Sequence, residues 1–173
     1  MLLIDREGSA TEAWTRADGA AIGNLSHALV GWDALPEALD QKSSDQKIGV
    51  LVPNSLPSEA LKPFFDQLAL VAIGFPAFAD GRGFSLAKVL RREGFRGTLR
   101  ASGPLIPDQF DYAIACGFDE IELPEASASR QSALQWQQAR GRLSRTYQRG
   151  YTRDGNILDR RRLARAAANS PAG

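Results

Sequence analysis

The sequence predicts an α/β fold of parallel βα units, arranged as an open sheet or a partial TIM-like barrel. Short apolar runs at residues 48–52 and 70–73 have the length and composition of buried parallel strands. Helical patterns follow these runs after short links, as expected for right-handed crossover connections. About four parallel strands are expected, which is too few for a complete eight-stranded barrel. A small strand-containing N-terminal lobe and a basic C-terminal helical tail complete the prediction.

The N-terminal lobe is assigned to residues 1–46. Its apolar residues 2–4, with Trp14 further along, predict a short strand or hairpin. Residues 28–32 predict another short strand, and Asp33 is placed to cap a brief helix after it. A polar linker over residues 43–47 marks the junction with the main α/β domain, assigned to residues 47–147.

The first half of the main domain alternates regularly. A helix is predicted from Ser58, its expected cap, to residue 68, with Pro63 near enough to the start to be tolerated. After the strand at 70–73, a turn leads into a helix at residues 85–92. Gly94 stands where a helix commonly ends.

The second half continues the same pattern. A strand is predicted at residues 97–101, followed by a helix that Asp108 caps and Gly117 closes. Residues 118–123 alternate in polarity, so this last strand is expected nearer an edge of the sheet. One long helix is predicted over residues 126–147.

The composition restricts the chemistry. The 173 residues include one Cys and one His, which argues against an internal disulfide, a CxxC redox pair, an iron–sulfur cluster or a His-rich metal site. We therefore expect no metal and no resident cofactor. Cys116 is expected to be buried, and His27 to be a surface or capping residue. No apolar stretch approaches the ~20 residues of a membrane span, and early charges argue against a secretory signal, so we expect a cytoplasmic protein.

Charge is distributed unevenly along the chain. Residues 1–138 have a balance of −6, whereas residues 139–173 contain nine arginines against two aspartates, a balance of +7. The extension at residues 148–173 is interpreted as a solvated helix, as an arm that docks on an acidic partner or a neighbouring subunit, or as a nucleic-acid contact. The nucleic-acid interpretation is the least favoured, because no recognised nucleic-acid fold accompanies the arginines.

The candidate site lies at the predicted carboxyl ends of the strands, where parallel α/β proteins collect ligands. Four charged residues are expected to converge there: Asp80, Arg82, Arg100 and Glu122. The guanidinium groups are suited to an anion, and Ser85 with the following helix N-terminus is a second anchor. Asp108 and Gln109 are placed nearby as further ligand contacts. Asp80 and Glu122 are the candidates for an acid or base.

An architectural interpretation of this cluster is favoured over the ligand site. Asp80-Gly81-Arg82-Gly83 is a common turn composition, and an Asp–Arg pair between neighbouring strands is a frequent structural contact. The two glycines are not a dinucleotide fingerprint either, because Leu86 stands where a third glycine is needed.

Several motifs resemble a bacterial domain-of-unknown-function family whose members are often labelled "oxidoreductase probably involved in sulfite reduction". The resemblance is carried by residues 75–91 and 97–103, by Asp108-Gln109 and by residues 116–119. It covers about residues 48–147 and implies an association with assimilatory sulfite reductase. The single Cys, the single His and the missing dinucleotide fingerprint provide no evident place for a redox cofactor.

Three functions therefore remain open. The first is an accessory protein of sulfite reduction that contacts the reductase or binds a small anion. The second is a TIM-barrel-like enzyme that uses Asp80 or Glu122 as a base on a phosphorylated or sulfated metabolite. The third is an oligomeric scaffold in which the basic tail holds a neighbouring copy.

Overall fold

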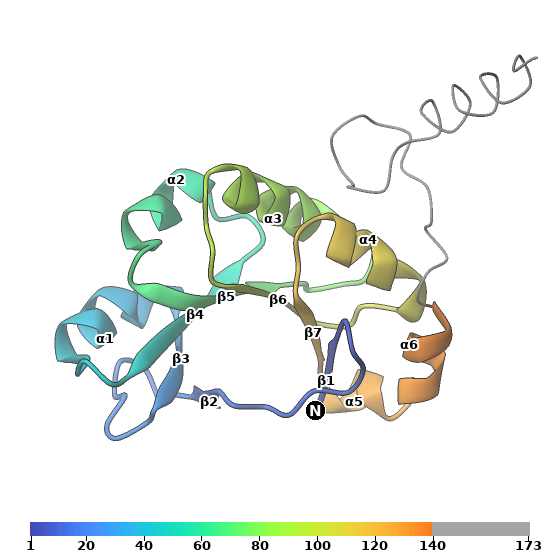
Figure 1. Ribbon diagram of the computed structural model, residues 1–173, viewed down its shortest axis with the longest axis horizontal. Coiled ribbons are helices and arrows are strands. Elements are labelled where there is room, and N and C mark those ends of the chain that lie inside the picture. The colour runs from blue at the N-terminus through green and yellow to red at the C-terminus, as the bar shows by residue number, and fades with distance from the viewer. Residues whose placement is uncertain (140–173) are drawn as a thin grey trace, which may run out of the picture.

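The computed structural model describes residues 1–139, and its seven strands form one sheet that curls into a half-barrel (Figure 1). The strands are β1 (Leu2–Asp5), β2 (Thr15–Arg16), β3 (His27–Gly31), β4 (Lys47–Pro53), β5 (Leu68–Gly74), β6 (Thr98–Ser102) and β7 (Glu120–Leu123). Their order across the sheet is β1-β7-β6-β5-β4-β3-β2. The predicted α/β class with parallel βα units is confirmed.

Among the described strands, pairing is parallel from β2 through β7, and only β1 runs antiparallel, against β7. Register brings Arg100 beside Glu120 and Ser102 beside Glu122 on the neighbouring strand. The last strand of the main domain, β7, is second from the edge because β1 pairs along its outer side. This arrangement places two acidic residues of β7 next to the arginine of β6.

The strands of residues 1–46 belong to the same sheet as the rest of the chain. β3 pairs with β4 over five residue pairs, and β1 pairs with β7 over four. The boundary that the sequence suggests between residues 46 and 47 therefore does not separate two sheets. Both ends of the sheet are made by N-terminal residues.

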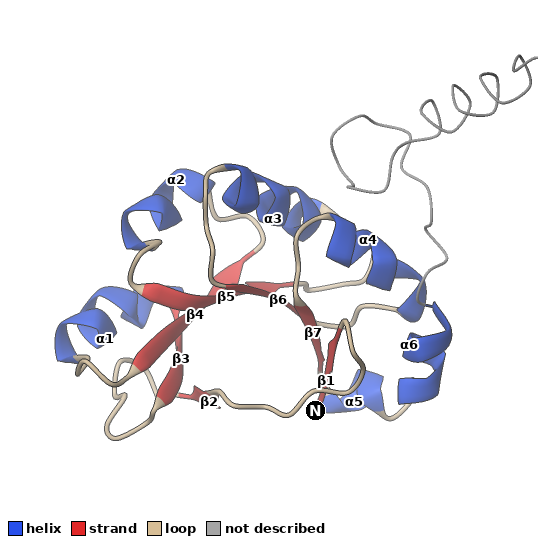
Figure 2. Cartoon of the chain, in the orientation of Figure 1, coloured by secondary structure: helices blue, strands red, loops and turns tan. Residues whose placement is uncertain are grey.

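The helices lie on the outer, convex side of the half-barrel (Figure 2). They are α1 (Leu35–Gln41), α2 (Ser58–Leu61), α3 (Arg82–Arg92), α4 (Phe110–Ala115), α5 (Glu125–Ala128) and α6 (Ala133–Ala139), with 3-10 turns at Trp32–Ala34, Lys62–Phe64 and Pro107–Gln109. The longest of them, α3, starts three residues before the predicted helix and ends as predicted, with Gly94 just beyond it at φ +103°. Positive φ is the conformation that makes glycine common there.

Two predicted helices differ from the structure. The helix expected from residue 58 to residue 68 is one α-turn followed by a 3-10 turn, because Pro63 lacks the N–H that would continue the α-helix. Ser58 is not its cap; the Ser58 hydroxyl instead donates to Glu93 over 3.4 Å. The long helix expected over residues 126–147 is broken into α5 and α6 by the turn at 129–132, and residues 140–147 lie outside the described residues.

Two predicted caps also differ. Asp33 lies within the 3-10 turn before α1, and no side chain caps that helix. Asp108 lies within the 3-10 turn that precedes α4, so it does not cap the helix directly. Both helices begin in tight turns rather than at free ends, which leaves no N-cap position for either aspartate.

Side chains alternate between the two faces of the sheet. On β6, Leu99 and Ala101 join the main apolar core under the helices, while Arg100 points to the concave face. A smaller apolar cluster of Leu29, Leu70 and Ala72 lies on that concave face and packs against Trp14 and Leu51. The residues between β1 and β2 cross the open side of the half-barrel (Figure 1). We call residues 6–14 the N-terminal strap.

Among residues 1–139, none of the helices has the length and apolar composition of a membrane span.

Candidate functional site

Asp80 and Arg82 form a local ion pair in the loop between β5 and α3. Oδ1 of Asp80 accepts hydrogen bonds from the backbone N–H and Nε of Arg82 at 3.2 and 3.0 Å, and Oδ2 accepts one from a terminal guanidinium nitrogen at 2.6 Å. The Arg82 hydrogen bonds, with a smaller contribution from the Asn54 amide, lower the pKa of Asp80 well below its usual range. Asp80 is therefore a persistent carboxylate and a weak base.

The same loop is held by Gln109. Its Nε2 donates to the carbonyl oxygen of Phe78 at 2.8 Å, and its Oε1 accepts from the backbone N–H of Ile106 at 3.1 Å. At the start of the loop, the N–H of Phe75 donates to the carbonyl of Ser102 at 2.7 Å. The loop is thus tied to the end of β6 and to the turn before α4, and it leaves the Phe78 side chain 54% exposed.

A shallow hollow of about 360 Å³ lies where β4, β5 and β6 end. Its lining is mostly apolar and comprises Leu51, Pro53, Asn54, Gly74, Phe75, Pro76 and Ser102. Asn54 is buried, and although its Nδ2 atom is near enough to the Asp80 carboxylate to lower the pKa of that group, it makes no hydrogen bond of normal geometry within residues 1–139. This buried donor could meet an acceptor oxygen on a small ligand.

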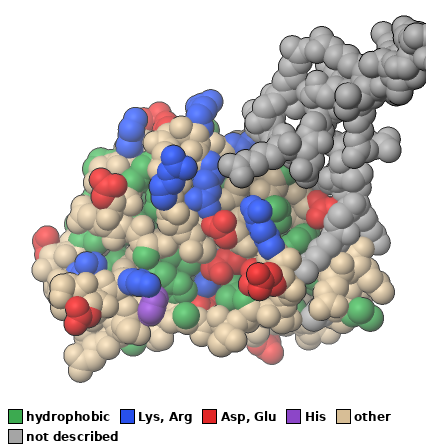
Figure 3. All heavy atoms as spheres, viewed as in Figure 1, with side chains coloured by type: hydrophobic (Ala, Val, Ile, Leu, Met, Phe, Trp, Pro, Cys, Tyr) green, Lys and Arg blue, Asp and Glu red, His purple; other side chains and the backbone are tan. Residues whose placement is uncertain are grey.

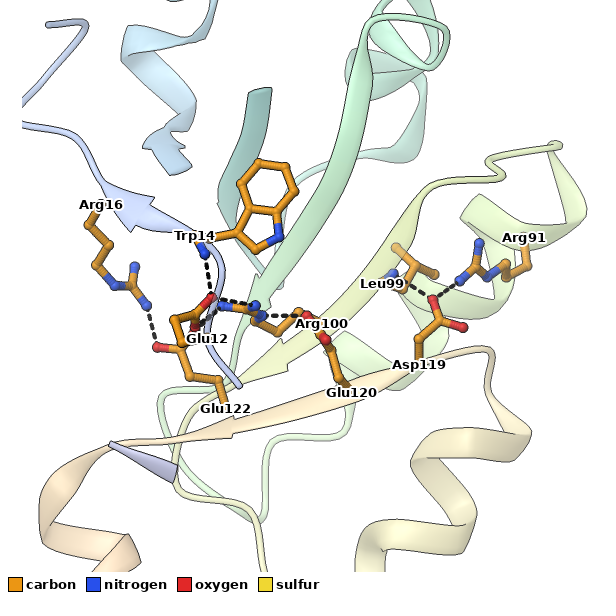
Figure 4. Close-up of polar contacts among 9 residues, drawn as sticks. All are labelled: Glu12, Trp14, Arg16, Arg91, Leu99, Arg100, Asp119, Glu120 and Glu122. Atoms are coloured by element: carbon orange, nitrogen blue, oxygen red, sulfur yellow. Dashed lines mark hydrogen bonds and ion pairs between the residues drawn. The ribbon is translucent and has the colours of Figure 1, made fainter. Parts of the chain in front are cut away.

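Arg100 lies inside the half-barrel, in the middle of β6, and not at the strand end where the sequence placed it (Figure 4). Its Nε donates to Glu120 at 2.7 Å, and its terminal nitrogens donate to Glu12 at 2.7 and 3.0 Å and to Glu122 at 3.1 Å. The Arg100 side chain is 2% exposed. The two bonds to Glu12 form a bidentate pair, the strongest geometry available to an arginine and a carboxylate.

Trp14 at the end of the strap and Arg16 in β2 complete this cluster. Arg16 in β2 donates to Glu122 at 2.5 Å, and the backbone N–H of Trp14 donates to Glu12 at 2.7 Å. Figure 4 shows the Trp14 ring beside the charged side chains, extending toward the strands of the sheet. The Trp14 ring also makes an edge contact with His27, with 5.2 Å between ring centroids.

Burial and pairing with Arg100 shift the pKa values of Glu12 and Glu120 in opposite directions. Burial opposes ionisation of Glu12, but hydrogen bonds from Arg100 and Trp14 outweigh it and lower the pKa of Glu12. For Glu120, burial is the larger effect and raises its pKa despite the hydrogen bond from Arg100. Burial likewise opposes the charge of Arg100, yet its carboxylate partners raise the pKa of that guanidinium.

The candidate residues from the sequence are therefore distributed over several places. Asp80 pairs with Arg82, Arg100 joins Glu122, and within residues 1–139 no hydrogen bond or ion pair links the two sets. Ser85 lines a groove between α3 and α4, and Asp108 lines a hollow beside α6. Among the described residues, no three His, Cys, Asp or Glu side chains are grouped to hold a metal ion.

Sequence reasoning missed Glu12 and Glu120 as partners of Arg100. The alternation of Glu120, Ile121 and Glu122 does indicate that both glutamates share one face of a strand. Glu12 is 88 residues away from Arg100, and nothing in the spacing of the N-terminal segment indicates that contact. The bond depends on how the strap crosses the half-barrel.

Comparison with known families finds a match. The family described as "Bacterial protein of unknown function (DUF934)" matches residues 49–157. The chain belongs to the DUF934 family. No curated protein and no solved structure matches it. The DUF934 match confirms the family resemblance found in the sequence, and its description assigns no activity. The match includes Asp80 and Arg100, while Glu12 and Trp14 lie before it.

Proposed function

We propose that this DUF934 protein is an accessory protein of assimilatory sulfite reduction that contacts the reductase. The observation that carries the proposal is the exposed Phe78 side chain, presented by a loop that is fixed by hydrogen bonds. The sulfite-reduction assignment comes from the family resemblance of residues 75–91 and 97–103. The loop with Phe78 lies within the first of these two segments.

The loop has properties that favour protein contact. Pro76, Ala77, Phe78 and Ala79 are consecutive, apolar and exposed. Exposed aromatic residues commonly dominate the binding energy of interfaces when they insert into a pocket of the partner. Gln109 and the Asp80–Arg82 pair already fix the loop, so that binding to a partner immobilises few additional rotatable bonds and costs little conformational entropy.

The experiment is calorimetric titration of the protein into assimilatory sulfite reductase, with two matched variants. Phe78→Ala is expected to weaken binding by at least about tenfold, because it removes the proposed anchor. Leu134→Ala is the control, since Leu134 is an exposed apolar residue on α6, at 59% exposure. No binding of the wild-type protein, or equal losses from the two variants, would overturn the proposal.

A second candidate is recognition of a small anion or anionic metabolite in the hollow at the strand ends. Its specific support is the buried Asn54 Nδ2, which makes no hydrogen bond of normal geometry within residues 1–139 and lies where parallel sheets bind ligands. The interior of the half-barrel is less suitable, because Trp14 and the Arg100 cluster fill it. Titration with sulfite, sulfate and phosphate tests this candidate, and Asn54→Ala is expected to abolish any heat of binding.

A further inference from the structure

A groove of about 590 Å³ runs between α3 and the end of α4, on the outer surface of the helix layer. Its lining comes from one face of α3 and from three consecutive residues at the α4 terminus: Ser85, Lys88, Val89, Arg91, Arg92, Ala115, Cys116 and Gly117. Nothing in the predicted site or in the proposed contact loop uses this groove, apart from Ser85.

The charge of the groove has one sign. Three of its lining residues are cationic and none is acidic. α3 itself contains Arg82, Lys88, Arg91 and Arg92 and no acidic residue over its whole length. Figure 3 shows Lys and Arg side chains gathered over the part of the surface where Figure 1 draws α3. This surface therefore attracts acidic groups.

The cations differ in how firmly they are held. Arg91 pairs with Asp119 and donates to the carbonyls of Phe95, Gly97 and Gly117, which fixes its position at the groove wall. The Lys88 ammonium lies 5.1 Å from the centre of the Tyr112 ring. Arg92 is exposed and makes no ion pair within residues 1–139. The rim thus combines a fixed cation with an accessible one.

The floor of the groove is apolar and shaped by a glycine. Val89, Ala115 and Cys116 provide its apolar surface. Gly117 has a φ of +106°, and a Cβ atom there would lie 2.6 Å from Cγ of Arg91. Glycine at this position therefore lets the α4 terminus turn close to α3 without displacing Arg91.

We propose that the α3–α4 groove is the docking site for an acidic segment of a partner protein that carries an apolar side chain. The cations would pair with the acidic groups of this segment, and the apolar floor would receive the apolar side chain. The chain's own residues 140–173 have the same sign of charge as the groove, with nine arginines against two aspartates, so they are unsuited to fill it. The proposal stands independently of the reductase and of the Phe78 loop.

The test uses the full chain and a short fluorescein-labelled peptide composed of Glu and Leu. Fluorescence anisotropy should show saturable binding that weakens as salt rises from about 50 to about 300 mM. A reference peptide with Gln in place of each Glu should bind at least about tenfold more weakly. Arg92→Glu should weaken binding of the acidic peptide by about tenfold or more.

Two further variants locate the binding and keep the result interpretable. Arg96→Glu makes the same charge change at an exposed residue outside the groove lining, and it should alter affinity by less than about threefold. Ala115→Trp fills the groove from an exposed position where folding should be preserved, and it should abolish binding. Phe78→Ala should leave peptide binding unchanged, which separates this proposal from the reductase contact.

Three results would overturn the proposal. The first is no saturable binding of the acidic peptide. The second is equal loss from Arg92→Glu and Arg96→Glu, which indicates general electrostatic attraction. The third is self-association of the wild-type chain, measured by light scattering, that Ala115→Trp abolishes, because the occupant would then be a second copy.

Discussion

At the scale of single residues, Arg100 is a buried cation of the concave face with three carboxylate partners. Its guanidinium is almost fully buried and forms ion pairs with carboxylates of the strap and of β7. A buried charge is tolerated only where partners satisfy it, and removing one partner costs much more than the pair itself contributes. The cluster therefore holds the strap against the sheet only as long as it is complete.

Replacing Arg100 by Gln should lower the free energy of unfolding by about 3–5 kcal/mol at neutral pH. The reason is that Glu12, Glu120 and Glu122 would be left together without their shared cation. Urea denaturation followed by tryptophan fluorescence measures this loss. Arg82→Gln is the control and should change stability little, because the Arg82 side chain is 63% exposed. Equal effects of the two substitutions would contradict the assignment of Arg100 as the central cation.

The contributions of Glu12 and Glu120 to the free energy of unfolding should depend on pH in opposite ways. Glu12 has a lowered pKa, so its stabilisation is complete above its ordinary value of 4.5 and is lost as the pH falls through the lowered folded value. Glu120 has a raised pKa, so its contribution is present below 4.5 and is lost as the pH rises through the raised folded value.

Glu12→Gln should therefore flatten the acid side of the stability curve, and Glu120→Gln should flatten the part just above pH 4.5. Urea denaturation at a series of pH values from about 3 to about 8 measures both slopes. The same change of slope in both variants would contradict the opposite shifts.

At the scale of elements, the strap is fitted to the sheet by complementary residues. Gly49 in β4 has no side chain where the Trp14 ring lies; a Cβ atom there would be 3.0 Å from Trp14 and 3.0 Å from Leu70. Glycine weakens a strand, and its presence at such a position typically marks a close approach of another group. The strap is therefore an integrated element of the fold.

Trp14→Ala should lower the free energy of unfolding by about 2 kcal/mol, since the ring is partly buried. Gly49→Ala should also destabilise the protein, because the new methyl group meets the ring. In the double variant the cost of Gly49→Ala should be smaller, as expected for residues in contact. Urea denaturation of the four proteins measures this coupling, and strictly additive effects would show that strap and strand are independent.

At the scale of the whole molecule, the N-terminal residues close both sides of the sheet. Without residues 1–46, β4 and β7 become open edges and the concave apolar cluster loses Leu29 and Trp14. Exposed edges of this kind promote aggregation. We therefore expect residues 1–139 to unfold as one cooperative unit.

A chain that begins at residue 47 should therefore show no cooperative urea transition and should aggregate. The comparison is a chain that ends at residue 139, which keeps every described strand and should unfold cooperatively. Circular dichroism and light scattering distinguish the two. A cooperative transition in the chain from residue 47 would support an independent α/β domain.

The spacing of apolar residues predicted most strands and the presence of most helices, because this spacing reflects which side chains of a segment are buried. The strands at 48–52, 70–73 and 97–101 correspond to β4, β5 and β6 within a few residues. The prediction of one long helix from residue 126 was wrong, because a pattern of helix-forming residues does not reveal the turn at 129–132. The predicted site residues are divided between two places, Asp80 with Arg82 and Arg100 with Glu122, because Arg100 was expected at a strand end and lies in mid-strand.

The sequence by itself determined the α/β class, the parallel units, the DUF934 family and the burial of Cys116. These depend on local periodicity and on motifs of neighbouring residues. Only the tertiary structure decided that the N-terminal residues share the sheet, and that Arg100 is paired with Glu12 across the concave face. The physical reason is that sheet curvature and the path of the strap bring distant residues together, and no local pattern encodes that contact.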